Sequence, residues 1–258
     1  MAAAASDGFG VTQAVFIQCF NEPPVEEARW ILDLMSAEGS AVCGLVAHIP
    51  VPDGAAAVED FLDSLRGDDG ALPAGLKGGR IAFANQVTEP LFVEGLKALG
   101  AAGLSWDFCI RAEDIRNVTQ AAKQVPDMPL ILDHFGHGGS VDSAYPREEW
   151  RAAMAELAAT CPNVFVKVGS MFTDGEEAAS YFDDAIAMFG YERLLAESNW
   201  FVGSSGGSSY HSVYTLLMEA CDRAGATDKQ KAMVFHENAR RAYRLRASGT
   251  GTASKAKL

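Results

Sequence analysis

Residues 130–169, LILDHFGHGGSVDSAYPREEWRAAMAELAATCPNVFVKVG, indicate how this chain folds. The stretch begins with an apolar run at Leu130 and ends with a β-branched and aromatic run from Val164 to Gly169. Between these runs, Arg147 to Thr160 carries apolar residues three and four positions apart with charged residues opposite, which is typical of an amphipathic helix. Strand, helix and strand in this order predict a βαβ unit, whose two strands are parallel.

The same alternation runs through most of the chain. Further strand-like runs begin near Ala14, Gly44, Gly79, Trp106 and Leu194, which brings the predicted strands to seven. Further helices are predicted at Val25 to Glu38, Ala112 to Val125, Gly175 to Phe189, Tyr210 to Ala224 and Thr227 to Arg246. Strand starts about thirty residues apart suit repeated βαβ units. The sequence therefore predicts a fold of the α/β class, a parallel sheet covered by helices.

Proline and glycine mark the boundaries of several of these segments. Proline opens helices at Pro23-Pro24 and at Thr88-Glu89-Pro90. Glycine closes helices at Gly39, Gly103 and Gly190.

Length and strand count suggest two architectures. At 258 residues the chain has the size of one (β/α)8 barrel, which takes about 250 residues. However, only seven strands are predicted, and residues 1–10 are rich in alanine and glycine. The chain is then either a distorted TIM-like (β/α)8 barrel that lacks its first strand or a doubly wound open sheet. No change of composition divides residues 14–246, which are expected to form one domain between flexible ends at 1–13 and 247–258.

Charge and composition narrow the range of partners. A formal net charge of -13 argues against nucleic acid and anionic membrane surfaces. No apolar run reaches the roughly 18 residues of a membrane span, and the N-terminus does not resemble a signal peptide. The five cysteines, which form no C-x-x-C pair, are expected to be reduced: Cys19, Cys43, Cys109, Cys161 and Cys221. These features predict a cytoplasmic protein, or a peroxisomal one if the C-terminal Ala256-Lys257-Leu258 acts as an address of the Ser-Lys-Leu type.

Polar residues at the predicted strand ends are the candidates for chemistry, because active residues of parallel α/β folds collect there. His134 follows the strand at Leu130, Arg111 follows the strand at Trp106, and Asn199-Trp200 follow the strand at Leu194. Arg80 and Lys167 lie within their strands.

Six segments together resemble the amidohydrolase-related branch of the amidohydrolase superfamily, which includes lactonases of sugar acids and the pyrone dicarboxylate hydrolase. The segments are residues 77–80, 106–111, 129–136, 163–170, 192–200 and 238–245, and the resemblance extends from Val15 to Leu245. It implies a barrel that hydrolyses a lactone or a similar cyclic ester of a small organic acid. In that family a His-x-His pair lies on the first strand, a histidine on the sixth, and an aspartate that acts as general base on the eighth.

Of these three features, the chain has the sixth-strand histidine and lacks the other two. His134 matches the sixth-strand histidine. Asn199 stands where the aspartate is expected, and an amide cannot accept a proton at neutral pH. No His-x-His pair occurs among the five histidines, His48, His134, His137, His211 and His236. Glu197, two residues before Asn199, is a candidate substitute acid.

Each candidate has a functional and a structural interpretation. His134 would polarise a substrate carbonyl or bind a metal, or else be satisfied by neighbouring carbonyl groups. Arg80 and Arg111 would clamp a substrate carboxylate, or pair with acidic side chains at the mouth of the barrel. Lys167 would line the pocket or pair with a buried carboxylate, and Trp200 would contact the substrate.

Three further residues are expected to lie outside the chemistry. Asp133 is expected to point outward, opposite to His134, because neighbouring strand residues alternate. His137 is either part of the site or solvated, and His48 is structural or lines the pocket.

Three hypotheses follow from these residues. The first is an active lactonase that works without a metal, or with one zinc or manganese ion, on a small acidic or lactone substrate. The second is a catalytically inactive barrel that binds a small acid or a protein partner. The third is an incomplete gene model that lacks the first strand. The sequence leaves the oligomeric state open, a homo-oligomer included.

Overall fold

The structure is a computed structural model that describes residues 9–84, 86–137, 145–169, 175–202 and 209–246. The C-terminal tripeptide Ala256-Lys257-Leu258 and most of the two ends predicted to be flexible lie outside these residues, so those expectations stay predictions.

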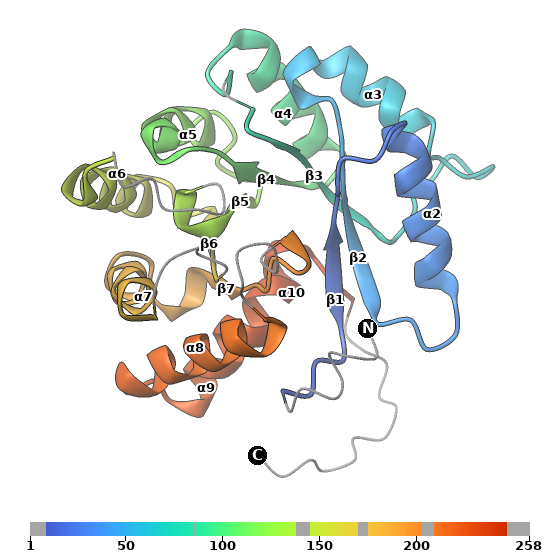
Figure 1. Cartoon of the computed structure of the whole chain (residues 1–258). Helices are drawn as coiled ribbons and strands as arrows, with labels where there is room; N and C mark the ends of the chain where they lie inside the picture. The colour runs from blue at the N-terminus through green and yellow to red at the C-terminus, as the bar shows by residue number, and fades with distance from the viewer. Residues whose placement is uncertain (1–8, 85, 138–144, 170–174, 203–208, 247–258) are drawn as a thin grey trace.

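Seven parallel strands form one sheet, in which each strand pairs with the next along the chain. The strands are β1 (Ala14–Ile17), β2 (Val42–Ala47), β3 (Leu76–Ala82), β4 (Ser105–Cys109), β5 (Leu130–Leu132), β6 (Val164–Val168) and β7 (Leu194–Ala196). The sheet curls, and the helices lie on its outer side (Figure 1). A doubly wound sheet reverses its strand order at a switch point, whereas this order is β1 to β7 without reversal. The distorted barrel is therefore confirmed, and the open doubly wound alternative is wrong.

Helices connect the strands and form the outer layer. They are α2 (Pro24–Ser36), α3 (Ala55–Asp63), α4 (Pro90–Ala101), α5 (Ile115–Ala122), α6 (Arg147–Thr160), α7 (Gly175–Phe189), α8 (Tyr210–Arg223), α9 (Asp228–Ala232) and α10 (Asn238–Ala242). Short 3-10 helices are η1 (Val51–Asp53), η2 (Ala112–Asp114), η3 (His134–Gly136) and η4 (Tyr191–Arg193), and a π-helical turn, η6, spans Met233–Glu237. Among the described residues, no helix is long and apolar enough to cross a membrane.

Most helix boundaries agree with the local signals. Pro24 and Pro90 lie in the first turns of α2 and α4, where the missing N–H of proline costs nothing. Gly39, Gly103 and Gly190 all adopt positive φ after helices. The predicted helix from Thr227 to Arg246 is instead divided, because η6 interrupts it and α10 ends at Ala242.

The sheet separates two apolar clusters. On β4, Trp106 and Phe108 belong to the large cluster between the sheet and the outer helices. The small cluster fills the barrel interior and contains Val46, Ile131, Phe165, Leu195, Ala242 and Tyr243. Asp107, between Trp106 and Phe108, faces this interior, since it accepts a hydrogen bond from Tyr243.

The C-terminal helix lies beside the gap between the first and last strands. Among the described residues, β1 and β7 each pair with a single strand, and α10 lies between them in Figure 1. Tyr243 and Leu245 pack in the same interior cluster as Val15 of β1 and Leu195 of β7. Side chains of the C-terminal segment thus cover apolar surface that the two strand edges would expose.

Candidate active site

A buried lysine links the two neighbouring strands β4 and β5. The Nζ atom of Lys167, on β6, lies 2.7 Å from Asp107 Oδ2 and 2.7 Å from Asp133 Oδ1. Both carboxylates are fully buried. The pairing of Lys167 with buried carboxylates is one of the two interpretations that the sequence left open for this residue.

Two further groups complete this network from opposite sides. Arg80 Nη1 donates to Asp133 Oδ2 at 3.1 Å, and Arg80 Nη2 donates to the backbone carbonyl of Gln18 at 2.8 Å. Tyr243 Oη donates to Asp107 Oδ2 at 2.7 Å. The network therefore joins β1, β3, β4, β5 and β6 to the C-terminal segment.

The two carboxyl groups differ in acidity. Burial alone raises the pKa of Asp133, but Lys167 and Arg80 outweigh burial and hold this pKa at about 2. Burial raises the pKa of Asp107 to about 6, because Lys167 offsets burial only in part and the charge of Asp133 adds to it. Burial lowers the pKa of Lys167, but the two aspartates outweigh it, and this pKa lies well above its usual value. Lys167 is thus a permanent internal cation at neutral pH.

The expectation that Asp133 points outward is wrong. Its side chain has no solvent exposure and meets Arg80 and Lys167 inside the barrel. Strand β5 ends at Leu132, and His134 and Phe135 adopt φ values of 54° and 55°. Asp133 is extended and continues the inward face of Ile131, which packs in the interior cluster. The left-handed backbone at His134 ends the alternation, so the His134 ring stays close to the Asp133 carboxylate.

His134 is held by a carboxylate. Its ring Nδ1 lies 2.5 Å from Glu197 Oε1, and its backbone N–H donates to the same oxygen at 3.2 Å. Both side chains are largely buried. Gly169 permits this approach of β6 and β7, because a Cβ atom there would lie 2.3 Å from the carbonyl oxygen of Glu197. With the Nδ1 proton directed to Glu197, the neutral ring presents Nε2 as a proton acceptor.

The remaining predicted residues lie around the rim of this end of the barrel. Asn199 is partly exposed with φ 47°, and Trp200 is 58% exposed. Arg111 is exposed, and its guanidinium lies 5.8 Å from the centre of the Phe83 ring. The structure therefore brings His134, Arg80 and Lys167 together in the interior and leaves Arg111 and Trp200 near the solvent.

Two other histidines are buried or partly buried. His137 is buried and stacks on Trp150 with a distance of 5.7 Å between the ring centroids. The alternative prediction that His137 is solvated is therefore wrong. His48 is partly buried, and burial lowers its pKa.

Three buried groups approach closely enough to be tested as metal ligands. One ligand atom each from Cys109, Asp133 and His134 lies within 4.8 Å of the others. However, the two oxygens of Asp133 already lie against the cations Lys167 and Arg80. Burial raises the pKa of the Cys109 thiol to about 12, so a metal bound there would also have to displace the thiol proton. A divalent cation would have to displace a buried ammonium or guanidinium, so this set does not fit a resident metal.

Comparisons with known proteins identify the family of this chain. A model of the amidohydrolase family matches residues 2–245. The L-rhamnono-gamma-lactonase of Scheffersomyces stipitis is 21% identical over 265 residues, which cover 87% of this chain and 79% of the lactonase. An uncharacterized protein of Sinorhizobium fredii is 31% identical over 161 residues, or 60% of this chain. The match spans only about half, 52%, of that relative's length.

Solved structures share the fold. A zinc-bound amidohydrolase of Burkholderia multivorans superposes with a TM-score of 0.76 at 21% identity, over 91% of this chain and 84% of that one. A Pseudomonas putida protein assigned as a 2-pyrone-4,6-dicarboxylic acid hydrolase gives 0.69 at 17% identity, over 96% and 88% of the two chains. At these identities the similarity establishes the architecture.

Proposed function

The chain belongs to the amidohydrolase family, and on that premise we propose that it hydrolyses a lactone or a similar cyclic ester of a small organic acid. Its similarity to a rhamnonolactonase and to a protein assigned as a pyrone dicarboxylate hydrolase supports this reaction class. So does the position of His134 at the C-terminal end of β5, since this end of a barrel carries the chemistry.

The contact of His134 with Glu197 is the observation that carries the proposal. A general base must be oriented and must have a free acceptor atom. Glu197 accepts from both the ring and the backbone of His134, which fixes the ring and leaves Nε2 for a water molecule. The pair supplies the proton acceptor that Asn199 does not.

The reaction then needs one proton transfer in each direction. Nε2 of His134 takes a proton from water as the water oxygen attacks the ring carbonyl carbon. The tetrahedral intermediate collapses with cleavage of the ring C–O bond, and the imidazolium returns its proton to the leaving alkoxide. Glu197 stabilises the transient imidazolium by its negative charge, as a carboxylate does beside other catalytic histidines.

The other predicted residues receive roles in substrate binding. Arg111 is exposed at the rim and is suited to a bidentate contact with a substrate carboxylate. In the proposed site Asn199 orients the water by hydrogen bonding, and Trp200 covers the apolar side of the ring. Arg80 and Lys167 act mainly through Asp133, because both contact its carboxylate.

The proposed reaction uses no metal, because the donor set of Cys109, Asp133 and His134 does not fit one. Hydrolysis is therefore expected to persist after dialysis against EDTA and to gain nothing from added zinc or manganese. Activity of the dialysed protein, shown by mass spectrometry to be free of metal, checks the first part, and activity with each metal added checks the second.

A panel of aliphatic and aromatic lactones, with and without a second carboxylate, tests the proposal. We expect turnover of at least one lactone by the unaltered chain. Glu197→Gln keeps the size of the side chain but removes its charge, and should lower kcat by about 10²- to 10⁴-fold, the usual contribution of a positioned base. His134→Gln should do the same.

Glu192→Gln is the matched control, because Glu192 is exposed near the same strand. It should retain full activity. Lack of turnover of every lactone by the folded protein would contradict the proposal and leave the alternative of an inactive barrel that binds a small acid.

A further inference from the structure

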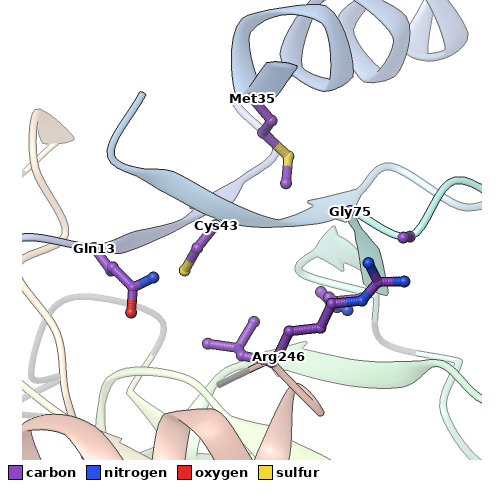
Figure 2. A pocket seen from close by; sticks show the side chains of 8 residues that line it. Gln13, Met35, Cys43, Gly75 and Arg246 are labelled. Atoms are coloured by element: carbon purple, nitrogen blue, oxygen red, sulfur yellow. The ribbon is translucent and has the colours of Figure 1, made fainter. Parts of the chain in front are cut away.

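A cavity lies at the opposite end of the barrel from His134. Its volume is about 260 Å³, and Figure 2 shows the side chains that line it. Gln13 directly precedes β1, and Cys43 and Lys77 are the second residues of β2 and β3, so the cavity lies at the N-terminal ends of these strands. Leu245 and Arg246, which follow α10, close it from another side.

The cavity carries two positive charges. Lys77 and Arg246 both line it, although the chain as a whole has a net charge of -13. Lys77 Nζ donates to the backbone carbonyl of Arg244 at 3.4 Å. Within the part of the chain that the structure describes, neither cation lies in an ion pair with a carboxylate. Burial lowers the pKa of Lys77, and repulsion by Arg246 lowers it further, as expected for charges that lack a counterion.

Apolar groups face the same space. Met35, near the end of α2, and Leu245 supply the apolar lining. The Met35 side chain lies so close to Gly75 that a Cβ atom there would be 2.6 Å from its methyl carbon. Cys43 presents a thiol that is partly exposed, and it projects toward the cavity in Figure 2.

We propose that this cavity binds a small organic carboxylate with a short apolar chain. The carboxylate would lie between Lys77 and Arg246, and the chain would lie against Met35 and Leu245. At about 30 Å³ for each water-sized group, the cavity holds eight or nine such groups, which is the size of a six-carbon acid. This site is distinct from the proposed hydrolytic site and does not depend on it.

Hexanoate and its neutral counterpart 1-hexanol are the probes that test this site. We expect calorimetry to detect saturable binding of hexanoate to the intact chain. The rate at which N-ethylmaleimide alkylates Cys43 should fall at least fivefold at saturating hexanoate. Cys19 is an internal control, because it is also partly exposed but follows the opposite end of β1. Its rate should not change.

Substitutions test whether hexanoate binding requires the two positive charges or only the shape of the cavity. The double variant Lys77→Met and Arg246→Met preserves apolar bulk and should lose both hexanoate binding and the protection of Cys43. Lys97→Met removes an exposed lysine on α4 and should behave like the unaltered chain. Equal protection by hexanol, equal protection in the double variant, or no binding of hexanoate would each overturn the proposal. The comparison of hexanoate with hexanol on the unaltered chain decides it even where the double variant does not fold.

Discussion

At the residue scale, Lys167 is the group that allows two carboxylates to be buried inside the barrel. Asp107 lies on β4 and Asp133 directly follows the neighbouring strand β5, and the two carboxylates would repel each other without a cation between them. A buried charge that loses its partner costs several kcal/mol, since the interior solvates it poorly. The Lys167 ammonium therefore stabilises the barrel interior and also fixes the positions of the two carboxylates.

Lys167→Met should lower the free energy of unfolding by about 3–5 kcal/mol, the usual cost of breaking a buried ion pair. Urea denaturation followed by circular dichroism measures it. Lys97→Met, an exposed lysine, should change the same quantity by less than about 0.5 kcal/mol. A loss below 1 kcal/mol for Lys167→Met would show that the ion pairs contribute little.

Asn199 stands where the resemblance to the amidohydrolase-related branch predicts an aspartate. If the His134–Glu197 pair is the base, restoring a carboxylate at position 199 adds a group that the reaction does not require. Asn199→Asp should then change kcat by less than about tenfold, whereas His134→Gln removes about 10²-fold or more. Steady-state kinetics on the best lactone compares the two. An increase of 100-fold or more for Asn199→Asp would assign the missing base to position 199.

At the scale of elements, one glycine decides how closely α4 approaches the turn η1. A Cβ atom at Gly95 would lie 2.2 Å from the backbone carbonyl oxygen of Val51. Backbone cannot move aside as a flexible side chain can. The contact between α4 and η1 therefore requires a residue without a side chain at this position.

Gly95→Ala should destabilise the protein by about 1–3 kcal/mol, the range found for overpacked positions. Gly100→Ala is the matched control on the same helix, because its nearest neighbour would be the flexible Met128 side chain at 3.3 Å. The higher helix propensity of alanine, about 1 kcal/mol, should make Gly100→Ala neutral or stabilising. Thermal denaturation of the two variants should separate them, and equal melting temperatures would contradict the steric argument.

At the scale of the whole molecule, the C-terminal segment contributes to the barrel interior. Tyr243 lies among side chains of β2, β5, β6 and β7 in the interior cluster. Its hydroxyl also donates to Asp107, 136 residues earlier in the chain. The last described helix is thus tied to the ion network at the centre of the fold.

Tyr243→Phe removes this one hydrogen bond without changing the shape of the ring. It should cost about 2 kcal/mol of unfolding free energy, as expected for a hydrogen bond to a charged group. Tyr145→Phe, at a partly exposed position before α6, should cost less than about 0.5 kcal/mol. Chemical denaturation checks both, and equal effects would mean that the Asp107 contact does not stabilise the fold.

Local signals were sufficient for most of the elements. All seven strands were predicted, and α6 has the predicted bounds Arg147–Thr160. Both results follow because the hydrophobic periods of strands and amphipathic helices can be seen within a short stretch of sequence. The pattern missed α3, which has only nine residues. It also missed the division of the last predicted helix at η6.

The candidate site was predicted less completely than the elements. His134 and Arg80 were selected because parallel strands end at one edge, and that rule depends on strand order alone. The contact between His134 and Glu197 joins residues 63 positions apart. The left-handed backbone at His134 ends the alternation from which Asp133 was expected to point away from His134. By itself the sequence determined the strands, the helices, the family and the end of the barrel that carries chemistry. Only the tertiary structure decided which charges meet, because burial and pairing depend on distances between segments that no local period encodes.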